Sequence, residues 1–145
     1  MAGTITIREV ETKRDRKTFV DVPFGLYADD PNWVPPLKTE ALGLITQEKN
    51  GWFSHAKAQL FLAEQDGRVV GRISAHIDTL ALTMPAEQGF GPGVGQWGLM
   101  EAESEPVFQA LLAAADAAAC AVGAGRPALP RAASPAARRA VSQSG

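Results

Sequence analysis

Residues 58–78, AQLFLAEQDGRVVGRISAHID, decide the fold class of this chain. Asp66-Gly67 lies between two runs rich in Val, Ile, Leu and Phe, which is the strongest short-range signal for a β-hairpin. Side chains of a strand alternate between its two faces. The second run therefore has an apolar face and a polar face, made of Gly71, Ile73, Ala75 and Ile77 on one side and Arg72, Ser74, His76 and Asp78 on the other.

Upstream of this hairpin the sequence predicts one strand and two helices. Residues 4–10 alternate Thr and Ile as a half-buried strand does. Thr12 followed by Asp15 predicts a helix start, and Pro23 is expected to end or kink that helix. After a turn-rich connector, Pro36 is expected to open a short helix whose apolar side is made of Leu37, Leu42, Leu44 and Ile45.

Downstream, residues 89–95 read as a connecting loop with glycine at every second position, followed by a strand over 96–103. Ser104-Glu105-Pro106 caps a helix that starts with Val107 and Phe108. No strand is predicted after it. The element order indicates an α+β protein with a mixed sheet that is incomplete, with four strands and three helices.

The composition of the chain limits the classes of function that it can have. The chain has 145 residues, 46% of them apolar, and a net charge of −2, as expected of one folded domain. A near-neutral chain gives no electrostatic reason to expect nucleic acid or an anionic membrane as a partner. The single cysteine, Cys120, excludes an internal disulfide and a Cys-based zinc site. Without a recognisable signal peptide, a cytoplasmic location is expected.

The C-terminal region differs from the rest. Residues 1–105 carry ten Lys and Arg against fifteen Asp and Glu, whereas residues 106–145 carry four Arg and one Asp. Residues 110–145 contain fifteen alanines. The expected division is therefore a folded part over 1–122 and a disordered tail over 123–145, because so few large apolar residues cannot offset the entropy lost on ordering. The tail reads either as a frame-shifted or truncated product of GC-rich DNA or as a genuine weakly basic tail.

Several stretches carry a family resemblance, and it covers about residues 4–118. Residues 5–10 (ITIREV), 27–37 (YADDPNWVPPL), 50–56 (NGWFSHA) and 71–77 (GRISAHI) resemble a bacterial family that is similar to the first half of the GNAT superfamily of acyl-CoA-dependent N-acetyltransferases. The resemblance implies a GNAT-like acyl-CoA N-acyltransferase fold. It also implies acyl transfer from a CoA thioester, with acetyl-CoA as co-substrate, to a small-molecule or peptide amine.

The resemblance also implies site residues. The period of two places Glu101 and Glu103 on one face of the fourth strand, and one of them would act as general base. The backbone of that strand at Leu99 and Met100 would dock the thioester. The acceptor would meet Trp52 and His55, with Arg72 and His76 from the polar row. The competing interpretations are a solvated strand end for the two glutamates and a solvent-facing sheet surface for the polar row. Two isolated histidines predict no metal site.

The sequence differs from the GNAT superfamily at the turn that binds CoA. The turn that usually holds the CoA pyrophosphate on backbone amides reads EAESEPV here, over residues 101–107, with no glycine and three carboxylates that would repel an anion. The alternative functions are a non-catalytic GNAT-like interaction module or inactive fragment and, less favoured, a nucleotide hydrolase. Self-association is expected if the helix face of Phe108, Leu111 and Leu112 stays uncovered.

Overall fold

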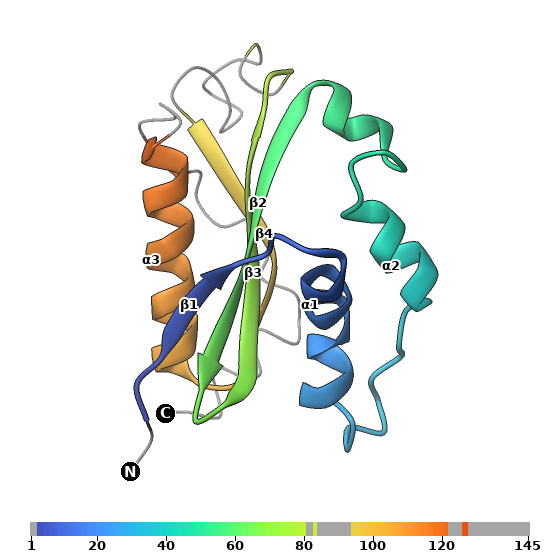
Figure 1. The fold of residues 1–145 in the computed structure, drawn as a ribbon, viewed down its shortest axis with the longest axis vertical. Coiled ribbons are helices and arrows are strands. Elements are labelled where there is room, and N and C mark those ends of the chain that lie inside the picture. Colours follow the sequence, from blue (N-terminus) through green and yellow to red (C-terminus); the bar gives the residue numbers. More distant parts are fainter. Residues whose placement is uncertain (1–2, 81–82, 84–93, 122–125, 128–145) are drawn as a thin grey trace.

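The computed structural model describes residues 3–80, 83, 94–121 and 126–127, and shows one sheet with helices on both faces (Figure 1). The sheet runs in the order β1-β2-β3-β4-β5. Strands β1 to β4 are antiparallel neighbours, and β5 pairs parallel to β4. Helix α3 packs on one face, and α1 and α2 lie on the other. The elements are β1 (Thr6–Glu9), α1 (Lys13–Leu26), α2 (Lys38–Leu44), the 3-10 helix η1 (Gly51–Ser54), β2 (Ala56–Gln65), β3 (Arg68–Asp78), β4 (Val94–Ala102), α3 (Glu105–Ala121) and β5 (Arg126–Pro127).

The central hairpin confirms the sequence prediction. Asp66 has a φ of 54° and Gly67 a φ of 74°, as a primed two-residue turn requires. Gln65 pairs with Arg68 directly beside this turn, and the ladder continues to Ala56 and Asp78. The polar and apolar faces of β3 are therefore fixed by the turn itself.

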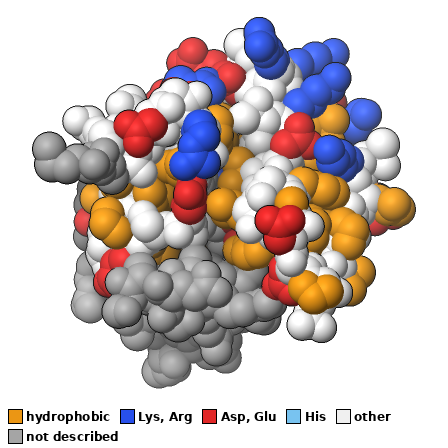
Figure 2. Space-filling model, turned by 90° about the horizontal axis from the view of Figure 1, so that it is seen from below, with side chains coloured by type: hydrophobic (Ala, Val, Ile, Leu, Met, Phe, Trp, Pro, Cys, Tyr) orange, Lys and Arg blue, Asp and Glu red, His pale blue; other side chains and the backbone are white. Residues whose placement is uncertain are grey.

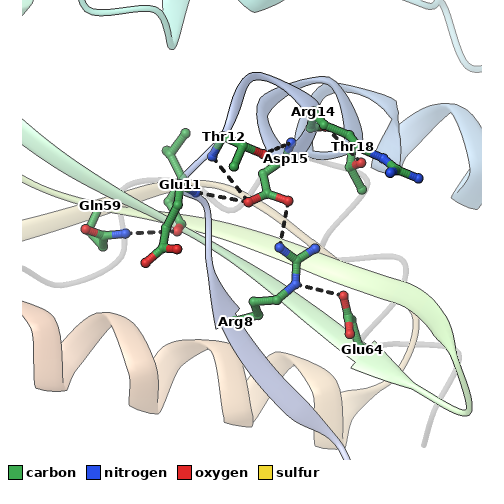
Figure 3. A network of polar contacts seen from close by, with 9 residues as sticks. Arg8, Glu11, Thr12, Arg14, Asp15, Thr18, Gln59 and Glu64 are labelled. Atoms are coloured by element: carbon green, nitrogen blue, oxygen red, sulfur yellow. Dashed lines mark hydrogen bonds and ion pairs between the residues drawn. The ribbon is translucent and has the colours of Figure 1, made fainter.

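The start of α1 is fixed by a capping box and an arginine (Figure 3). The Asp15 amide donates to the Thr12 hydroxyl over 3.0 Å, and the Asp15 carboxylate accepts from the Thr12 amide. Arg8 of β1 donates to Asp15 over 2.7 Å and to Glu64 of β2 over 2.9 Å. The Arg8 guanidinium and the Glu11 and Thr12 amides lower the pKa of Asp15 to about 2. This network joins α1 to the edge of the sheet.

Pro23 does not end α1, which was the first of the two outcomes predicted for it. The helix continues to Leu26 with Pro23 buried inside it. Proline lacks the N–H that would bond to the carbonyl four residues earlier, so the Phe19 carbonyl has no such helical donor. Arg72 of β3 donates Nη1–H to that carbonyl over 2.8 Å. Arg72 of the sheet thus supplies the hydrogen bond that the Phe19 carbonyl cannot receive from Pro23.

Helix α2 starts later than predicted and buries little. It begins at Lys38, two residues after Pro36, which was predicted to be its first residue. Of the expected apolar side, Ile45 is buried and Leu42 is half-buried. Leu37 and Leu44 are exposed, because this seven-residue helix contacts α1 along only part of its surface.

Two apolar clusters form the core, one on each face of the sheet. The α3 face is made of Phe61, Ala63, Val70, Ile73, Ala75, Met100, Ala102, Val107, Leu111 and Ala115. The opposite face is made of Phe19, Val20, Val22, Ile45 and Leu62. Gly71 lets α3 approach, because a Cβ there would lie 2.8 Å from Val107 Cγ1 and 2.9 Å from Leu111 Cδ1.

The C-terminal elements correct two further expectations. Leu111 is fully buried against the sheet, and Phe108 and Leu112 pack on the same cluster half-buried, so the helix face expected to be uncovered is covered in part. A short strand does follow α3, since Val94 and Gly95 of β4 pair with Arg126 and Pro127. Most of the loop at 89–95, and residues 128–145 of the tail, lie outside the described residues.

Candidate functional site

A β-bulge in β4 marks the first polar cluster. Arg72 pairs with Glu101 and Ser74 with Gly98, so β4 spans three residue steps where β3 spans two. Inside this bulge Leu99 has a φ of 51° and is 46% exposed. Left-handed backbone costs a non-glycine residue about 1–2 kcal/mol. Such strain persists only where the surrounding structure fixes it, and it is typical of functional sites.

Glu101 follows the bulge and is buried, with 7% of its surface exposed. Its carboxylate accepts a hydrogen bond from the hydroxyl of Tyr27, the residue that ends α1. Tyr27 also packs against Trp33, with ring centroids 5.7 Å apart. The sequence marked Tyr27 only as an aromatic residue of a connector, since nothing local shows that the end of α1 reaches β4.

Arg72 connects α1 to the bulge. Its Nε–H donates to the Leu99 carbonyl over 3.1 Å, and its Nη1–H donates to the Phe19 carbonyl. The guanidinium lies 4.8 Å from the centre of the Phe19 ring. Burial lowers the pKa of Arg72, and the charges of Glu101 and Tyr27 oppose that shift. We call Tyr27, Arg72, Leu99 and Glu101 the bulge cluster.

Glu103 is separate from this cluster, which corrects the expectation that both glutamates share one strand face. Strand β4 ends at Ala102, and the Glu103 amide donates to the Val70 carbonyl over 2.9 Å. The exposed Glu103 carboxylate accepts from Arg68 over 3.3 Å. Chain direction changes at the end of the strand, so the period of two no longer applies to Glu103.

A second cluster lies at the C-terminal end of β3 and brings together three predicted substrate-binding residues. Asp78 accepts from Trp52 Nε1–H over 3.0 Å and contacts His55 Nδ1 over 2.8 Å. The rings of Trp52 and His76 meet edge to face, 5.4 Å apart. We call Trp52, His55, His76 and Asp78 the histidine cluster.

The chemistry of the histidine cluster follows from its acceptor. An ionised carboxylate only accepts hydrogen bonds, so Nδ1 of His55 carries a proton toward Asp78. A His55 ring with that single proton presents Nε2 as an acceptor. Burial lowers the pKa of His76, whereas Asp78 and Gln96 act in the opposite direction. Asp78, which the sequence placed in the polar row without a role, is the residue that holds this cluster together.

The polar row of β3 is not a solvent-facing surface. Ser74 is buried and donates to the Gly98 carbonyl over 3.0 Å, while Arg72, His76 and Asp78 are half-buried. Arg72 and His76 are four residues apart, which corresponds to about 13 Å along a strand. The row therefore joins two distinct clusters on the face that carries α1 and α2.

The arrangement of strands and helices is similar to that of a solved protein structure. A solved tandem GNAT protein from the clavulanic acid biosynthesis pathway, determined without AcCoA, superposes with a TM-score of 0.59 over 83% of this chain and 34% of its own, at 14% sequence identity. The chain therefore has part of the GNAT-like fold. Strands β1 to β4 and the three α-helices make up that incomplete GNAT-like fold.

Sequence relatives cover the same region. The chain is 42% identical over 113 residues to the bacterial ceramide synthase of Caulobacter vibrioides and 39% identical over 112 residues to protein YghO of Escherichia coli. Each match covers 77% of this chain, which spans 28% and 27% of these relatives. No protein-family model matches.

Within this GNAT-like fold, the expected CoA-docking residues differ in exposure. Leu99 lies exposed in the bulge, while the side chain of Met100 is buried in the α3-face cluster, so Met100 offers only its backbone. The turn before α3 is also less acidic than predicted. Glu101 is directed toward Tyr27 on the opposite face, and Glu103 pairs with Arg68, which leaves Glu105 in the first turn of α3.

The described residues contain no group of three or more His, Cys, Asp or Glu side chains placed to hold a metal ion. None of the described helices is long and apolar enough to cross a membrane.

Proposed function

We propose that the chain contributes the first part of an N-acyltransferase that moves an acyl group from a CoA thioester to an amine. The observation that carries this proposal is the strained bulge at Leu99, directly followed by the buried carboxylate of Glu101. A bulge disrupts the β-ladder locally and turns backbone groups away from the neighbouring strand. Backbone N–H groups released in this way are suited to a thioester carbonyl on which negative charge develops.

In the proposed reaction the amine nitrogen attacks the thioester carbonyl carbon. The C–N bond forms, the C–S bond breaks, and CoA leaves as a thiolate that takes up a proton. Glu101 would accept the proton lost by the amine, and its hydrogen bond from Tyr27 would hold the carboxylate in position. Arg72, whose donors already bind the Leu99 and Phe19 carbonyls, would position the bulge rather than contact the acceptor.

The amine of the acceptor would lie at Glu101, and the rest of the acceptor would extend along the α1–α2 side of β3 toward the histidine cluster, which provides an aromatic edge and a hydrogen-bond acceptor. One relative is named as a ceramide synthase, and ceramides are amides of a long-chain amine and a fatty acid. Long-chain amines and long-chain acyl-CoA are therefore the first substrates to test, beside acetyl-CoA.

A non-catalytic GNAT-like module is the second candidate. It is favoured by the turn at residues 101–107, where no glycine lets a pyrophosphate approach the backbone and where Pro106 lacks an N–H. In this case Tyr27, Arg72 and Glu101 would stabilise the fold without reacting.

Calorimetric titration of the 145-residue chain with acetyl-CoA and palmitoyl-CoA separates the two candidates. Binding with micromolar affinity supports an acyltransferase, and the absence of heat with both thioesters supports the module. Transfer is then followed by mass spectrometry of a sphingoid base. Glu101→Gln should slow it about 100-fold or more, since general base catalysis contributes at least that factor.

Glu103→Gln is the matched control, because it removes the same charge two residues away at an exposed position. It should keep the rate within about twofold, as expected of a surface ion pair with little energetic weight. Equal rates for the two variants would show that Glu101 is not the base.

A further inference from the structure

A cleft of about 450 Å³ opens between α1 and α2, away from both polar clusters. Four cationic side chains and one carboxylate line it, together with Leu42 and Thr46; the charged residues are Lys13, Arg16, Lys17, Lys49 and Glu48. We call these seven residues the cationic groove. Its net charge is +3, although the whole chain has a net charge of −2.

The spacing of these cationic residues along α1 brings their charges together on one side of the helix. Lys13, Arg16 and Lys17 lie three and four residues apart on α1, so they share one helix face and repel one another. Among the described residues, their side chains and that of Lys49 form no ion pair and no hydrogen bond. Lys38 of α2, in contrast, pairs with Asp21 of α1 over 2.9 Å. The groove is thus a concentration of positive charge that its one carboxylate, Glu48, offsets only in part.

Exposed apolar residues lie on α2 and in the connector before it. Leu44 ends α2 and is 62% exposed, Leu37 precedes the helix at 65%, and Val34 in the connector reaches 84%. These are three of the five exposed large hydrophobic residues of the described chain. Figure 2 shows Lys and Arg side chains gathered beside hydrophobic ones on the side that carries α1 and α2.

We propose that this side of the chain docks on a membrane surface that contains anionic phospholipid. The cationic groove binds headgroup phosphates, and Leu37 and Leu44 insert among the headgroups beside it. Basic residues next to exposed leucines are the pattern by which a helix lies on an anionic bilayer without crossing it. The proposal rests on these surface residues alone and does not depend on the proposed acyltransferase function.

Cosedimentation with vesicles tests the proposal. The whole chain should bind phosphatidylcholine vesicles that contain phosphatidylglycerol, should bind weakly to pure phosphatidylcholine, and should dissociate as salt is raised. The double variant Lys17→Gln/Lys49→Gln should bind the mixed vesicles about thirtyfold more weakly, because each cation near such a surface contributes about fivefold. Leu44→Ser should weaken binding about tenfold by removing an inserted apolar side chain.

The control is Lys57→Gln/Arg68→Gln, which removes the same two charges from exposed positions on β2 and β3. It should bind within about twofold of the unmodified chain, since charges beyond a Debye length are screened. An equal loss in both double variants would mean attraction by overall charge and would overturn the proposal. Displacement by soluble glycerol phosphate alone would also overturn it in favour of a small-phosphate site.

Discussion

The two faces of the sheet differ in what they bury. The α3 face carries a continuous apolar cluster that includes Ile73, Met100 and Leu111. The opposite face has a smaller cluster around Phe19 and Leu62, with the bulge cluster near the middle of β3 and the histidine cluster at its C-terminal end. Because β3 alternates its side chains, one strand serves both faces. The α3 face holds the fold together, and the face under α1 and α2 carries the candidate chemistry.

The largest expected effect lies on the apolar face. Leu111→Ala removes a fully buried side chain that packs near Gly71 and should lower the free energy of unfolding by about 4 kcal/mol. Urea titration measures this. Leu44→Ala, at an exposed position, should change stability by no more than about 0.5 kcal/mol. Similar losses for the two variants would show that α3 is not packed on the sheet as described.

A smaller effect is expected where the polar face meets α1. Arg72→Met leaves the Phe19 and Leu99 carbonyls without their donor and the buried Glu101 without its neighbouring cation, so it should cost about 3 kcal/mol. Arg68→Met, which breaks an exposed pair, should cost about 0.5 kcal/mol.

A double-mutant cycle with Pro23→Ala sharpens this result. Alanine at position 23 restores an N–H that can bond to the Phe19 carbonyl within the helix. Arg72→Met should then cost about 1 kcal/mol less than it does beside proline. Full additivity of the two changes would show that Arg72 does not compensate for Pro23.

The smallest effect concerns pH. Burial lowers the pKa of His76 below its ordinary value of 6.5. As pH falls below about 6.5, the unfolded chain takes up this proton before the folded chain does, so the folded state loses stability. His76→Gln should therefore lose less melting temperature than the unmodified chain between about pH 8 and pH 5.5. An NMR titration midpoint for His76 at or above 6.5 would contradict this.

Local chemistry made much of the fold predictable. The Asp66-Gly67 turn, the alternation along β3 and the Thr12–Asp15 capping box depend on neighbours within a few residues, and the structure confirms all three. The local sequence does not show that α1 continues past Pro23, because the donor that compensates for this proline is 49 positions away at Arg72. The covered face of α3 was missed for the same reason, since burial depends on which element packs opposite.

The candidate site was predictable only as residue types. Sequence reasoning selected Glu101, Arg72, His55, His76 and Trp52, but it placed Glu101 with Glu103 and left a solvent-facing surface as a competing interpretation of the polar row. Tyr27 lies 74 positions from Glu101, and no local pattern relates the two residues. Net charge likewise gave no reason to expect a membrane, because an average over the chain hides how charge is distributed on the surface.

The sequence by itself determined the hairpin, the order of the elements and the two faces of β3, because turn geometry and strand alternation act between near neighbours. Only the tertiary structure decided which residues meet on those faces. It paired Glu101 with Tyr27, and Asp78 with His55 and Trp52. It also paired Arg72 with the Phe19 carbonyl, to which Pro23 cannot donate a hydrogen bond. These contacts join segments far apart in the chain, so they form only when α1 and η1 pack on the sheet.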